Sequence, residues 1–448
     1  MKTPNLNLDR LHREAGWTQR QFALSVNRIG AERGMHLKYK EPSVNQWLKG
    51  HLPRESVRLI VLEALARRLN RAVSHIEAGF PAPAAPATSE MGIVQELVEL
   101  GRLDMDAARR SVLGAGIFST AMMIPNWHDA VERITAAESG RVRRIGNGEI
   151  AMVVAMTQQF SDLDYQFGGR DTRPTAAAFI VNTIAPYLTA EGSDSVRGKM
   201  LSAASDLCYL TGYMAVDEGQ QNLGQRYYLK AMELARASGD RNAYSLALHG
   251  MSSQALQLGH SRTALRLTSA AMNEGKSIES NLRAFLAGQR AYASALTGDQ
   301  RSALAFLREA ETEIGRTNAS SRVVMGHYRD AVLEYDIAQV KYGLGDTAGS
   351  VRSLKRYASL QNKRHRRRAV LDGATLAERQ MSMGHLEAAC ATWSQVMDDY
   401  PFVQSGRADQ RINSMRRSLK PFLTNPAAQA LHERAREMLQ RGVPRKDV

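Results

Sequence analysis

A glycine recurs at nearly even intervals in the second half of the chain, and this spacing restricts the fold more than any other feature. The glycines are Gly219, Gly259, Gly298, Gly345 and Gly384, separated by 40, 39, 47 and 39 residues. Seven residues before and five residues after each of them, the side chain is always small. Two antiparallel helices approach closely only where both present small residues, and a tight turn between them favours glycine. Because one helix pair cannot bury its apolar face alone, the spacing predicts stacked helical hairpins that form an α-solenoid.

The rest of the chain also shows helical patterning, without runs of alternating strands, so the sequence predicts an all-α protein. A run of three prolines between residues 81 and 86 cannot lie inside a helix and favours an extended tether. We therefore predict four parts: a domain at residues 1–80, a Pro/Ala linker at 81–89, connecting and capping helices or degenerate repeats at 90–193, and the repeat domain with C-terminal capping helices at 194–448.

Charge and cysteine content restrict the partners and the compartment. The formal net charge is +14, and residues 1–80 hold 14 basic and 7 acidic side chains. Such a balance favours a polyanionic partner, either nucleic acid or an anionic membrane surface, and does not choose between them. The two cysteines, Cys208 and Cys390, allow no disulfide framework and indicate a reducing compartment. With a polar start and no apolar run long enough for a membrane span, we expect a cytoplasmic protein.

Residues 6–80 show the order of a helix-turn-helix unit. Leu8, Leu11 and Ala15 give one apolar stripe, and Thr18 with Gln21 has the spacing of a capping box. The segment from 42 to 50 is a short helix with a proline start and a glycine stop, in which Val44, Trp47 and Leu48 are predicted to face inward.

This pattern resembles the repressor-like, XRE-type helix-turn-helix, although residues 27–41 make the interval between its two helices longer than in that family. Asn and Gln pair with adenine and Lys with guanine in the major groove, and basic side chains beside the recognition helix bind phosphates. The predicted DNA-binding residues are Gln19, Lys38, Lys40, Ser43, Asn45, Gln46, Lys49 and Arg54. The alternative interpretation is that the polar residues of this helix form a solvated face.

Residues 199–400 resemble the tetratricopeptide repeat, with periods longer than that family's roughly 34 residues. The resemblance implies that residues six and ten before each glycine face the concave groove of the solenoid. With two further polar positions, the predicted groove residues are Asp206, Tyr209, Tyr213, His249, Ser253, Tyr292, Tyr335, Gln339, Tyr342 and Glu378. Tyrosine offers apolar area and a hydrogen bond, which suits peptide capture. For any one of these tyrosines, packing between repeats is an equally good interpretation.

A second basic cluster comprises Arg352, Lys355, Arg356, Lys363, Arg364, Arg366, Arg367 and Arg368. We favour a solvated helix face and loop for it. A second DNA contact and a clamp for an acidic peptide remain the functional alternatives.

The order of parts resembles actinobacterial regulators of development and antibiotic production, and the peptide-responsive quorum-sensing regulators. The resemblance implies a sequence-specific, DNA-binding transcription regulator that is a homodimer, senses a peptide or a small effector through its repeats, and changes between DNA-competent and DNA-incompetent states. No motif of a phosphate-binding loop, a zinc protease or a nucleophile elbow is found, so we expect neither an enzyme nor a cofactor. The alternative function is a helical-repeat protein-interaction scaffold without specific DNA binding.

Overall fold

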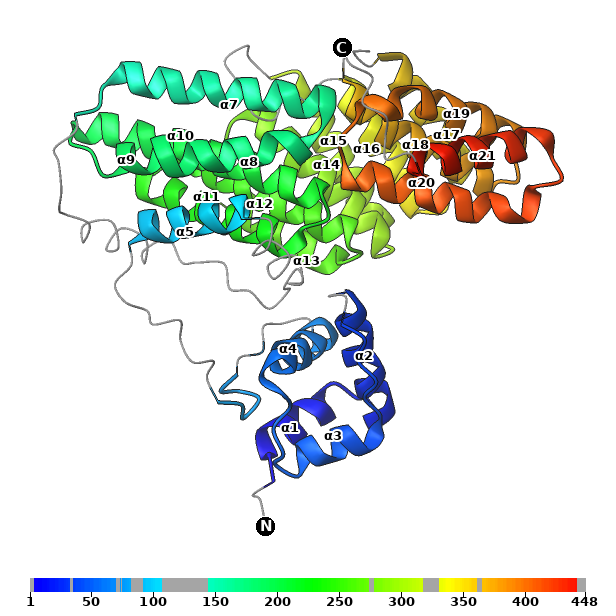
Figure 1. Cartoon of the computed structure of the whole chain (residues 1–448), viewed down its shortest axis with the longest axis horizontal. Coiled ribbons are helices and arrows are strands. Elements are labelled where there is room, and N and C mark those ends of the chain that lie inside the picture. The colour runs from blue at the N-terminus through cyan, green and yellow to red at the C-terminus, as the bar shows by residue number, and fades with distance from the viewer. Residues whose placement is uncertain are drawn as a thin grey trace.

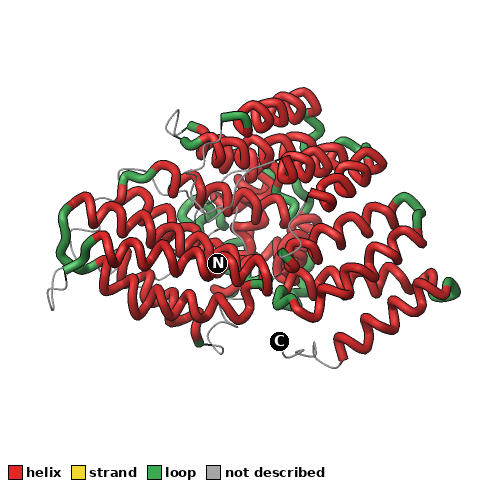
Figure 2. The backbone as a smooth tube through the Cα atoms, turned by 90° about the horizontal axis from the view of Figure 1, so that it is seen from above, coloured by secondary structure: helices red, strands yellow, loops and turns green. Residues whose placement is uncertain are grey.

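The computed structural model describes residues 4–32, 35–69, 73, 75–81, 92–106, 144–273, 278–316, 330–360 and 365–440. Within these ranges the regular structure is helical, and β-type pairing is limited to one isolated bridge between Arg144 and Glu191. Figure 1 shows the bundle α1–α4 apart from a larger helical body, and Figure 2 shows that body from above as helices joined by loops. The predicted all-α class is confirmed. No helix in the described ranges is long and apolar enough to cross a bilayer.

The first part of the chain forms a four-helix bundle. Its helices are α1 (Leu6–Glu14), α2 (Gln19–Glu32), α3 (Glu41–Leu48) and α4 (Glu55–Leu69). The apolar side chains of the predicted stripes are buried together, and the ring of Phe22 lies 5.4 Å from Trp17 and 6.3 Å from Trp47. The predicted capping box is present, because the Thr18 N–H donates to Gln21 Oε1 and the Gln21 N–H donates to Thr18 Oγ1. The predicted linker lies, apart from Pro81, outside the described residues.

The long interval between the second and third helices is explained by Asn27 and Tyr39. Helix α2 continues to Glu32, and residues 35–40 then run without regular structure to α3. The Asn27 amide donates to the Tyr39 carbonyl at 2.8 Å and accepts from the Tyr39 N–H at 2.8 Å. The Tyr39 ring packs against Trp47 at 5.1 Å. The additional residues therefore lengthen α2 and hold residues 35–40, which lead into α3, against the core.

Five consecutive helical hairpins form the solenoid. They are α10 (Asp194–Asp217) with α11 (Gln221–Ser238), α12 (Arg241–Gln257) with α13 (Ser261–Met272), α14 (Ser280–Leu296) with α15 (Gln300–Ile314), α16 (Asp330–Gly343) with α17 (Thr347–Leu360), and α18 (Arg366–Ser382) with α19 (Leu386–Asp399). Each predicted glycine lies in the turn of one hairpin with φ between +78° and +89°, a region that L side chains rarely adopt. The predicted turns are confirmed.

The small residues on either side of these glycines mark where the two helices of a hairpin touch. A Cβ added to Gly212 would lie 3.0 Å from the Gly224 carbonyl oxygen. In later hairpins the Ser252 hydroxyl donates to the Ala264 carbonyl at 3.3 Å, and the Ser350 hydroxyl donates to the Ala338 carbonyl at 2.8 Å. The predicted close approach therefore occurs at the predicted positions, and serine uses it for a hydrogen bond.

Further helices cover the two ends of the solenoid. Before the first hairpin lie α5 (Ile93–Met105), α7 (Asn147–Phe167), α8 (Gly169–Phe179), a π-helical turn (Ile180–Ile184) and α9 (Ala185–Leu188). After the last hairpin lie a 3-10 turn (Tyr400–Phe402), α20 (Gly406–Leu419), a second 3-10 turn (Lys420–Phe422) and α21 (Pro426–Gln440). Helix α7 packs on α10 and also on α18, and α20 packs on α18. The beginning and the end of the helical body thus meet, and the hairpins between them form a ring.

Candidate functional site: a cavity inside the helical ring

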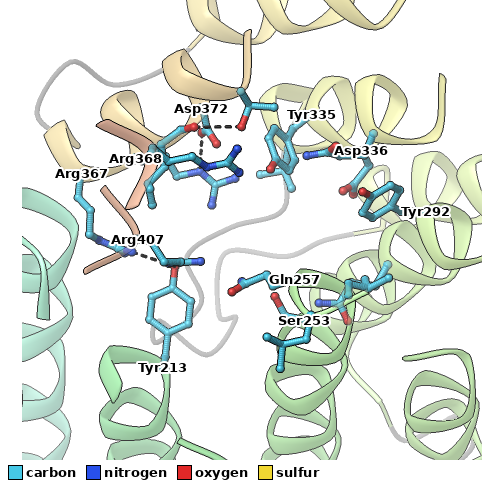
Figure 3. Close-up of a pocket in the computed structure, with 18 of the residues that line it drawn as sticks. Tyr213, Ser253, Gln257, Tyr292, Tyr335, Asp336, Arg367, Arg368, Asp372 and Arg407 are labelled. Carbon is cyan, nitrogen blue, oxygen red and sulfur yellow. Dashed lines mark hydrogen bonds and ion pairs between the residues drawn. The ribbon is translucent and has the colours of Figure 1, made fainter. Parts of the chain in front are cut away.

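The helices of the ring surround a cavity of about 960 Å³. Its lining comes mainly from α7 and α20 and from the first helix of each hairpin, namely α10, α12, α14, α16 and α18. Figure 3 shows side chains from several of these helices facing one space, with Tyr213 and Arg407 on one side and Tyr292, Tyr335 and Asp336 on another. A volume of this size is typical of sites for small molecules or short peptides.

Nine of the ten predicted groove residues line this cavity: Tyr209, Tyr213, His249, Ser253, Tyr292, Tyr335, Gln339, Tyr342 and Glu378. Asp206 is not among the lining residues, because the part of α10 that lines the cavity begins one turn later, at Tyr209. The repeat register therefore brings together residues that lie up to 169 positions apart in the sequence. That they bind a ligand stays a prediction.

Several tyrosines also pack between repeats, as the alternative interpretation has it. The Tyr209 ring lies 5.7 Å from Tyr228 on α11, and burial raises the pKa of Tyr209 well above its usual value. Tyr335 lies 5.3 Å from Tyr357 on α17. Both kinds of contact coexist, because one face of each ring touches the neighbouring helix while the residue still borders the cavity.

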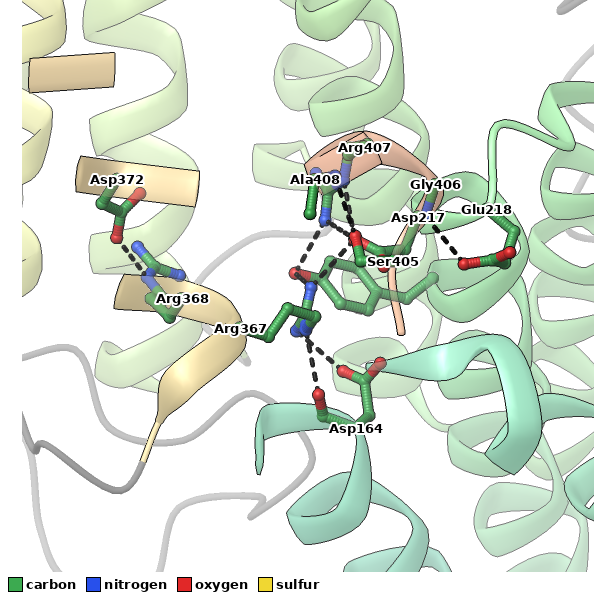
Figure 4. A network of polar contacts seen from close by, with 11 residues as sticks. Asp164, Asp217, Glu218, Arg367, Arg368, Asp372, Ser405, Gly406, Arg407 and Ala408 are labelled. Atoms are coloured by element: carbon green, nitrogen blue, oxygen red, sulfur yellow. Dashed lines mark hydrogen bonds and ion pairs between the residues drawn. The ribbon is translucent and has the colours of Figure 1, made fainter. Parts of the chain in front are cut away.

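A buried ion cluster closes the ring on one side of the cavity (Figure 4). We call it the clasp; it consists of Asp164, Tyr213, Asp217, Arg367 and Arg407. Arg367 donates from Nη2 to Asp164 Oδ2 at 2.8 Å, from Nη1 to Asp217 Oδ1 at 3.1 Å and from Nη1 to the Tyr213 hydroxyl at 3.2 Å. Arg407 approaches Asp217 Oδ1 at 2.6 Å through Nη2. The clasp joins α7, α10, α18 and α20, which are the helices where the two ends of the solenoid meet.

Burial and charge set the protonation of the clasp. Arg367, Asp164 and Asp217 are each at most 1% exposed, and the side chain of Arg407 is 20% exposed. Two carboxylates and two guanidinium groups therefore balance one another largely away from water. Burial raises the pKa of Asp164 to about 6, against the opposing effect of Arg367. Burial also acts to raise the pKa of Asp217, but Arg407 and Arg367 together hold it below its ordinary value. Asp217 is therefore the firmly ionised carboxylate, and Asp164 is the one nearest to taking up a proton.

A second contact lies beside the clasp. Arg170 on α8 donates to Glu218 Oε2 at 2.8 Å and to Asp409 Oδ2 at 2.6 Å, while the Gly406 N–H donates to Glu218 Oε1 at 2.9 Å. At Gly168 the chain passes the backbone of Gln404 so closely that an added Cβ would lie 2.2 Å from its carbonyl oxygen. Gly168 also has φ +95°, so glycine is needed there both for conformation and for space.

The basic cluster at 352–368 divides between surface and cavity. Arg352, Lys355 and Arg356 are exposed on α17, as a solvated face requires, and Lys363 and Arg364 lie outside the described residues. The expectation of a solvated face is wrong for Arg367 and Arg368, which line the cavity. Arg368 donates to the Tyr357 hydroxyl at 2.8 Å and to Asp372 at 3.1 Å. These two arginines lie in the first turn of α18, where they face the cavity.

The predicted DNA-binding residues lie together on the surface of the N-terminal bundle or close to it. Lys38, Lys40, Gln46, Lys49 and Arg54 are exposed, and Gln19, Ser43 and Asn45 are half-buried. Val44 and Trp47 are buried on the opposite side of α3. The arrangement leaves a polar face of α3 accessible, flanked by basic side chains.

Sequence reasoning missed Asp164, Asp217, Arg379 and Arg407. Two of them carry a signal in the repeat alignment. Asp217 occupies the position two before the turn glycine, where the other four repeats have no charged residue, and Arg379 occupies the position five before it, where the others have Met, Gln, Ala and Val. Asp164 and Arg407 lie outside the repeats and have no such signal. Among the described residues no group of three or more His, Cys, Asp or Glu side chains is placed to hold a metal ion.

Comparisons with known proteins add a similarity for the N-terminal bundle. The family model of the SP15 N-terminal domain matches residues 8–81. That match covers less than half of the chain and gives no family for the whole. No curated protein matches the sequence. The resemblance to XRE-type and actinobacterial regulators stays a prediction.

Two solved structures align along almost the full length at low similarity. They are monomeric mutants of IFIT1, one with Gppp-AAAA and one with m7Gppp-AAAA, each 13% identical and covering 97% of this chain and 100% of that chain. Their TM-scores are 0.33 and 0.34.

Proposed function

We propose that this chain is a helical-repeat interaction protein that holds a short peptide or a small effector in the cavity of its ring. The observation that carries this proposal is the lining itself, in which tyrosines from three hairpins share one space with arginines fixed by carboxylates. Tyrosine supplies apolar area and a hydroxyl at a low cost in side-chain entropy, which suits recognition of a flexible ligand.

We assign the cavity to binding and not to catalysis. Two of the carboxylates that face it are engaged with arginines: Asp372 pairs with Arg368 at 3.1 Å, and Glu378 pairs with Arg411. A general base or acid needs to reach a substrate proton, and an ion pair holds the carboxylate in its charged form and in place. These pairs therefore support a role in shaping and charging the binding surface.

The proposal is tested by retention of ligands on the immobilised full chain. Two pools are applied separately, random short peptides and the low-molecular-weight fraction of a cell extract. We expect at least one pool to contain compounds retained by the native chain and lost from the double variant Tyr292→Ala/Tyr335→Ala, which removes two rings from the cavity. Arg352→Ala, an exposed change on α17, is the matched control. Equal retention by all three proteins, or none from either pool, would contradict the proposal.

A second function, binding of duplex DNA by α1–α4, is favoured by the exposed polar face of α3. Gln46 and Lys49 are exposed there, and Lys38 and Lys40 are exposed directly before it. This is the pattern of the repressor-like helix-turn-helix that the sequence resembles, in which the second helix enters the major groove. In this proposal the chain is a cytoplasmic transcription regulator, resembling actinobacterial and peptide-responsive regulators, and binds a two-fold operator as a homodimer. The ligand in the ring then shifts the population of DNA-competent dimers.

DNA binding is tested by selecting genomic fragments with the full chain and measuring the gel shift of the best fragment at two salt concentrations. We expect Gln46→Ala to relax specificity at one base pair and to cost roughly 1–3 kcal/mol. Arg13→Ala, on the exposed surface of α1, should leave the affinity almost unchanged. Binding that is absent, or equal for all fragments and both variants, would leave the chain as an interaction protein without specific DNA contact.

A further inference from the structure

One buried arginine of the cavity has no acidic partner. Arg379 is 5% exposed, and among the described residues no carboxylate forms an ion pair with it. The neighbouring cavity arginines differ from it in this respect, since Arg367, Arg368, Arg407 and Arg411 each pair with an aspartate or a glutamate. A buried charge that is not neutralised is costly and is normally paired. Arg379 is therefore a buried positive charge of the cavity that no ion pair among the described residues neutralises.

Neutral contacts hold the guanidinium of Arg379 in position. Nη1 donates to the Ala338 carbonyl at 3.2 Å and to the Ser350 hydroxyl, and Nη2 donates to Gln339 Oε1. No described residue accepts a hydrogen bond from Nε. The guanidinium also lies over the Tyr342 ring, 4.3 Å from its centroid. These contacts hold the Arg379 guanidinium through its two Nη atoms. The Nε–H remains available to donate a hydrogen bond to an acceptor from outside the protein.

Three tyrosines surround this charge. Tyr292, Tyr335 and Tyr342 line the same cavity as Arg379. Burial raises the pKa of Tyr292 and of Tyr335, and the positive charge of Arg379 acts in the opposite direction on both. Tyr292 is half-buried and Tyr342 is 43% exposed, and both line the cavity. Figure 3 shows Tyr292 and Tyr335 on the same side of the cavity, beside Asp336. Phenol hydroxyls and a guanidinium edge together are donors suited to an oxygen anion.

We propose that Arg379, with the hydroxyls of Tyr292 and Tyr342, binds the anionic oxygen group, a carboxylate or a phosphate, of the ligand held in the ring. The proposal deepens the function assigned to the cavity and rests on it for the remainder of the ligand. An anion supplied by the ligand neutralises a charge that the fold leaves uncompensated.

Because Arg379 has no acidic partner among the described residues, its replacement has a predictable effect on the stability of the protein without ligand. Replacing a buried, uncompensated cation by an apolar side chain of similar length removes a desolvation cost. We therefore expect Arg379→Met to unfold at the same temperature as the native chain or higher, although it loses the hydrogen bonds to Gln339 and Ser350. A residue needed only for folding would give the opposite result, so this measurement separates a binding role from a structural one.

The test uses sodium acetate and sodium phosphate as probes, with thermal unfolding of the full chain as the readout. Both salts are compared with sodium chloride at matched ionic strength. Phosphate also stabilises proteins by exclusion from their surface, so the quantity of interest is the difference between the native chain and Arg379→Met. We expect one of the two anions to raise the melting temperature of the native chain by about 2 °C more than that of Arg379→Met. Arg352→Met, which removes an exposed arginine, should respond as the native chain does.

The two anions distinguish the sources of the oxygen group. A response to acetate alone assigns a carboxylate, and a response to phosphate assigns a phosphate. Equal responses of the native chain and Arg379→Met to both salts would overturn the inference. With a ligand from the retention experiment, Arg379→Met should weaken binding roughly 10- to 100-fold, the range expected for one charge-assisted hydrogen-bonded pair. Ligands retained equally by Arg379→Met would overturn the inference and leave the proposed function standing, whereas an Arg379-dependent anion response without any retained ligand would overturn the proposed function alone.

Discussion

Removal of Arg367 should destabilise the protein far more than removal of an exposed arginine. Its guanidinium is 1% exposed and donates to the side chains of Asp164, Asp217 and Tyr213 and to the backbone carbonyl of Asp164 at 2.9 Å. In Arg367→Ala, Asp217 keeps Arg407, but Asp164 is left as a buried carboxylate without its cation. Breaking a buried ion pair from one side costs about 3–5 kcal/mol. We expect a loss near the lower end of that range at pH 7.5, because Asp164 can escape part of the cost by taking up a proton.

Because Asp164 can take up a proton, the loss of stability in Arg367→Ala depends on pH, and the direction of this dependence follows from the pKa of Asp164. Burial already raises the pKa of Asp164 to about 6, above its unfolded value of about 3.9, so this group favours the folded state increasingly as the pH falls through 6. Below pH 6 the native Asp164 also becomes neutral, and the attraction that Arg367 supplies is weakened in the wild type. The destabilisation of Arg367→Ala should therefore be smaller at pH 5 than at pH 7.5.

Urea unfolding of the native chain, Arg367→Ala and the exposed control Arg352→Ala at both pH values measures this difference. We expect the control to lie within about 0.5 kcal/mol of the native chain. A loss below about 1 kcal/mol for Arg367→Ala at pH 7.5, or a loss that does not change between the two pH values, would refute the assignment of the clasp as a buried and coupled ion cluster.

Further expectations concern other parts of the structure. Burial lowers the pKa of His249 to about 3, so the folded protein keeps this ring neutral and loses stability as the pH falls below 6.5, the unfolded value. At pH 5 this loss is about 2 kcal/mol. In acid unfolding, His249→Phe should abolish this part of the pH dependence. Gly168→Ala should cost more than about 2 kcal/mol, since its Cβ would lie 2.2 Å from a backbone oxygen at φ +95°, while Gly148→Ala, with no atom within 4 Å, should be neutral or stabilising in calorimetry. Asn27→Ala should cost about 1–3 kcal/mol in thermal unfolding, because it leaves the backbone groups of Tyr39 unpaired; a loss near zero would show that water replaces the amide.

The repeat part of the fold is predictable because its determinants are local and recur. A turn glycine and two small residues are set by the contact between neighbouring helices, and these small residues are buried in every one of the five hairpins. The register of the first helix then decides which residues face the concave side. For this reason the sequence placed Tyr213, Tyr292 and Tyr335 in one cavity without knowledge of the curvature.

The clasp and the uncompensated arginine were not predictable in this way. Asp164 and Arg367 are 203 residues apart, and their contact depends on how far the solenoid curves before its ends meet. Curvature is a sum of small rotations between repeats, which the sequence does not state. The basic run at 363–368 therefore looked like a solvated face, although two of its members lie inside the ring. The function of the α3 surface is undetermined for a different reason, because a polar helix face has the same composition whether it meets water or DNA.

Hydrogen–deuterium exchange of the full chain, with and without a ligand retained by the cavity, tests the central claim most directly. The account predicts slower exchange in the helices that line the ring, above all α14, α16 and α18, and a smaller effect in α13 and α15, which contribute no lining residue. Protection confined to the outer helices or to α1–α4, with α14, α16 and α18 unchanged, would contradict the claim that the ring is the binding site.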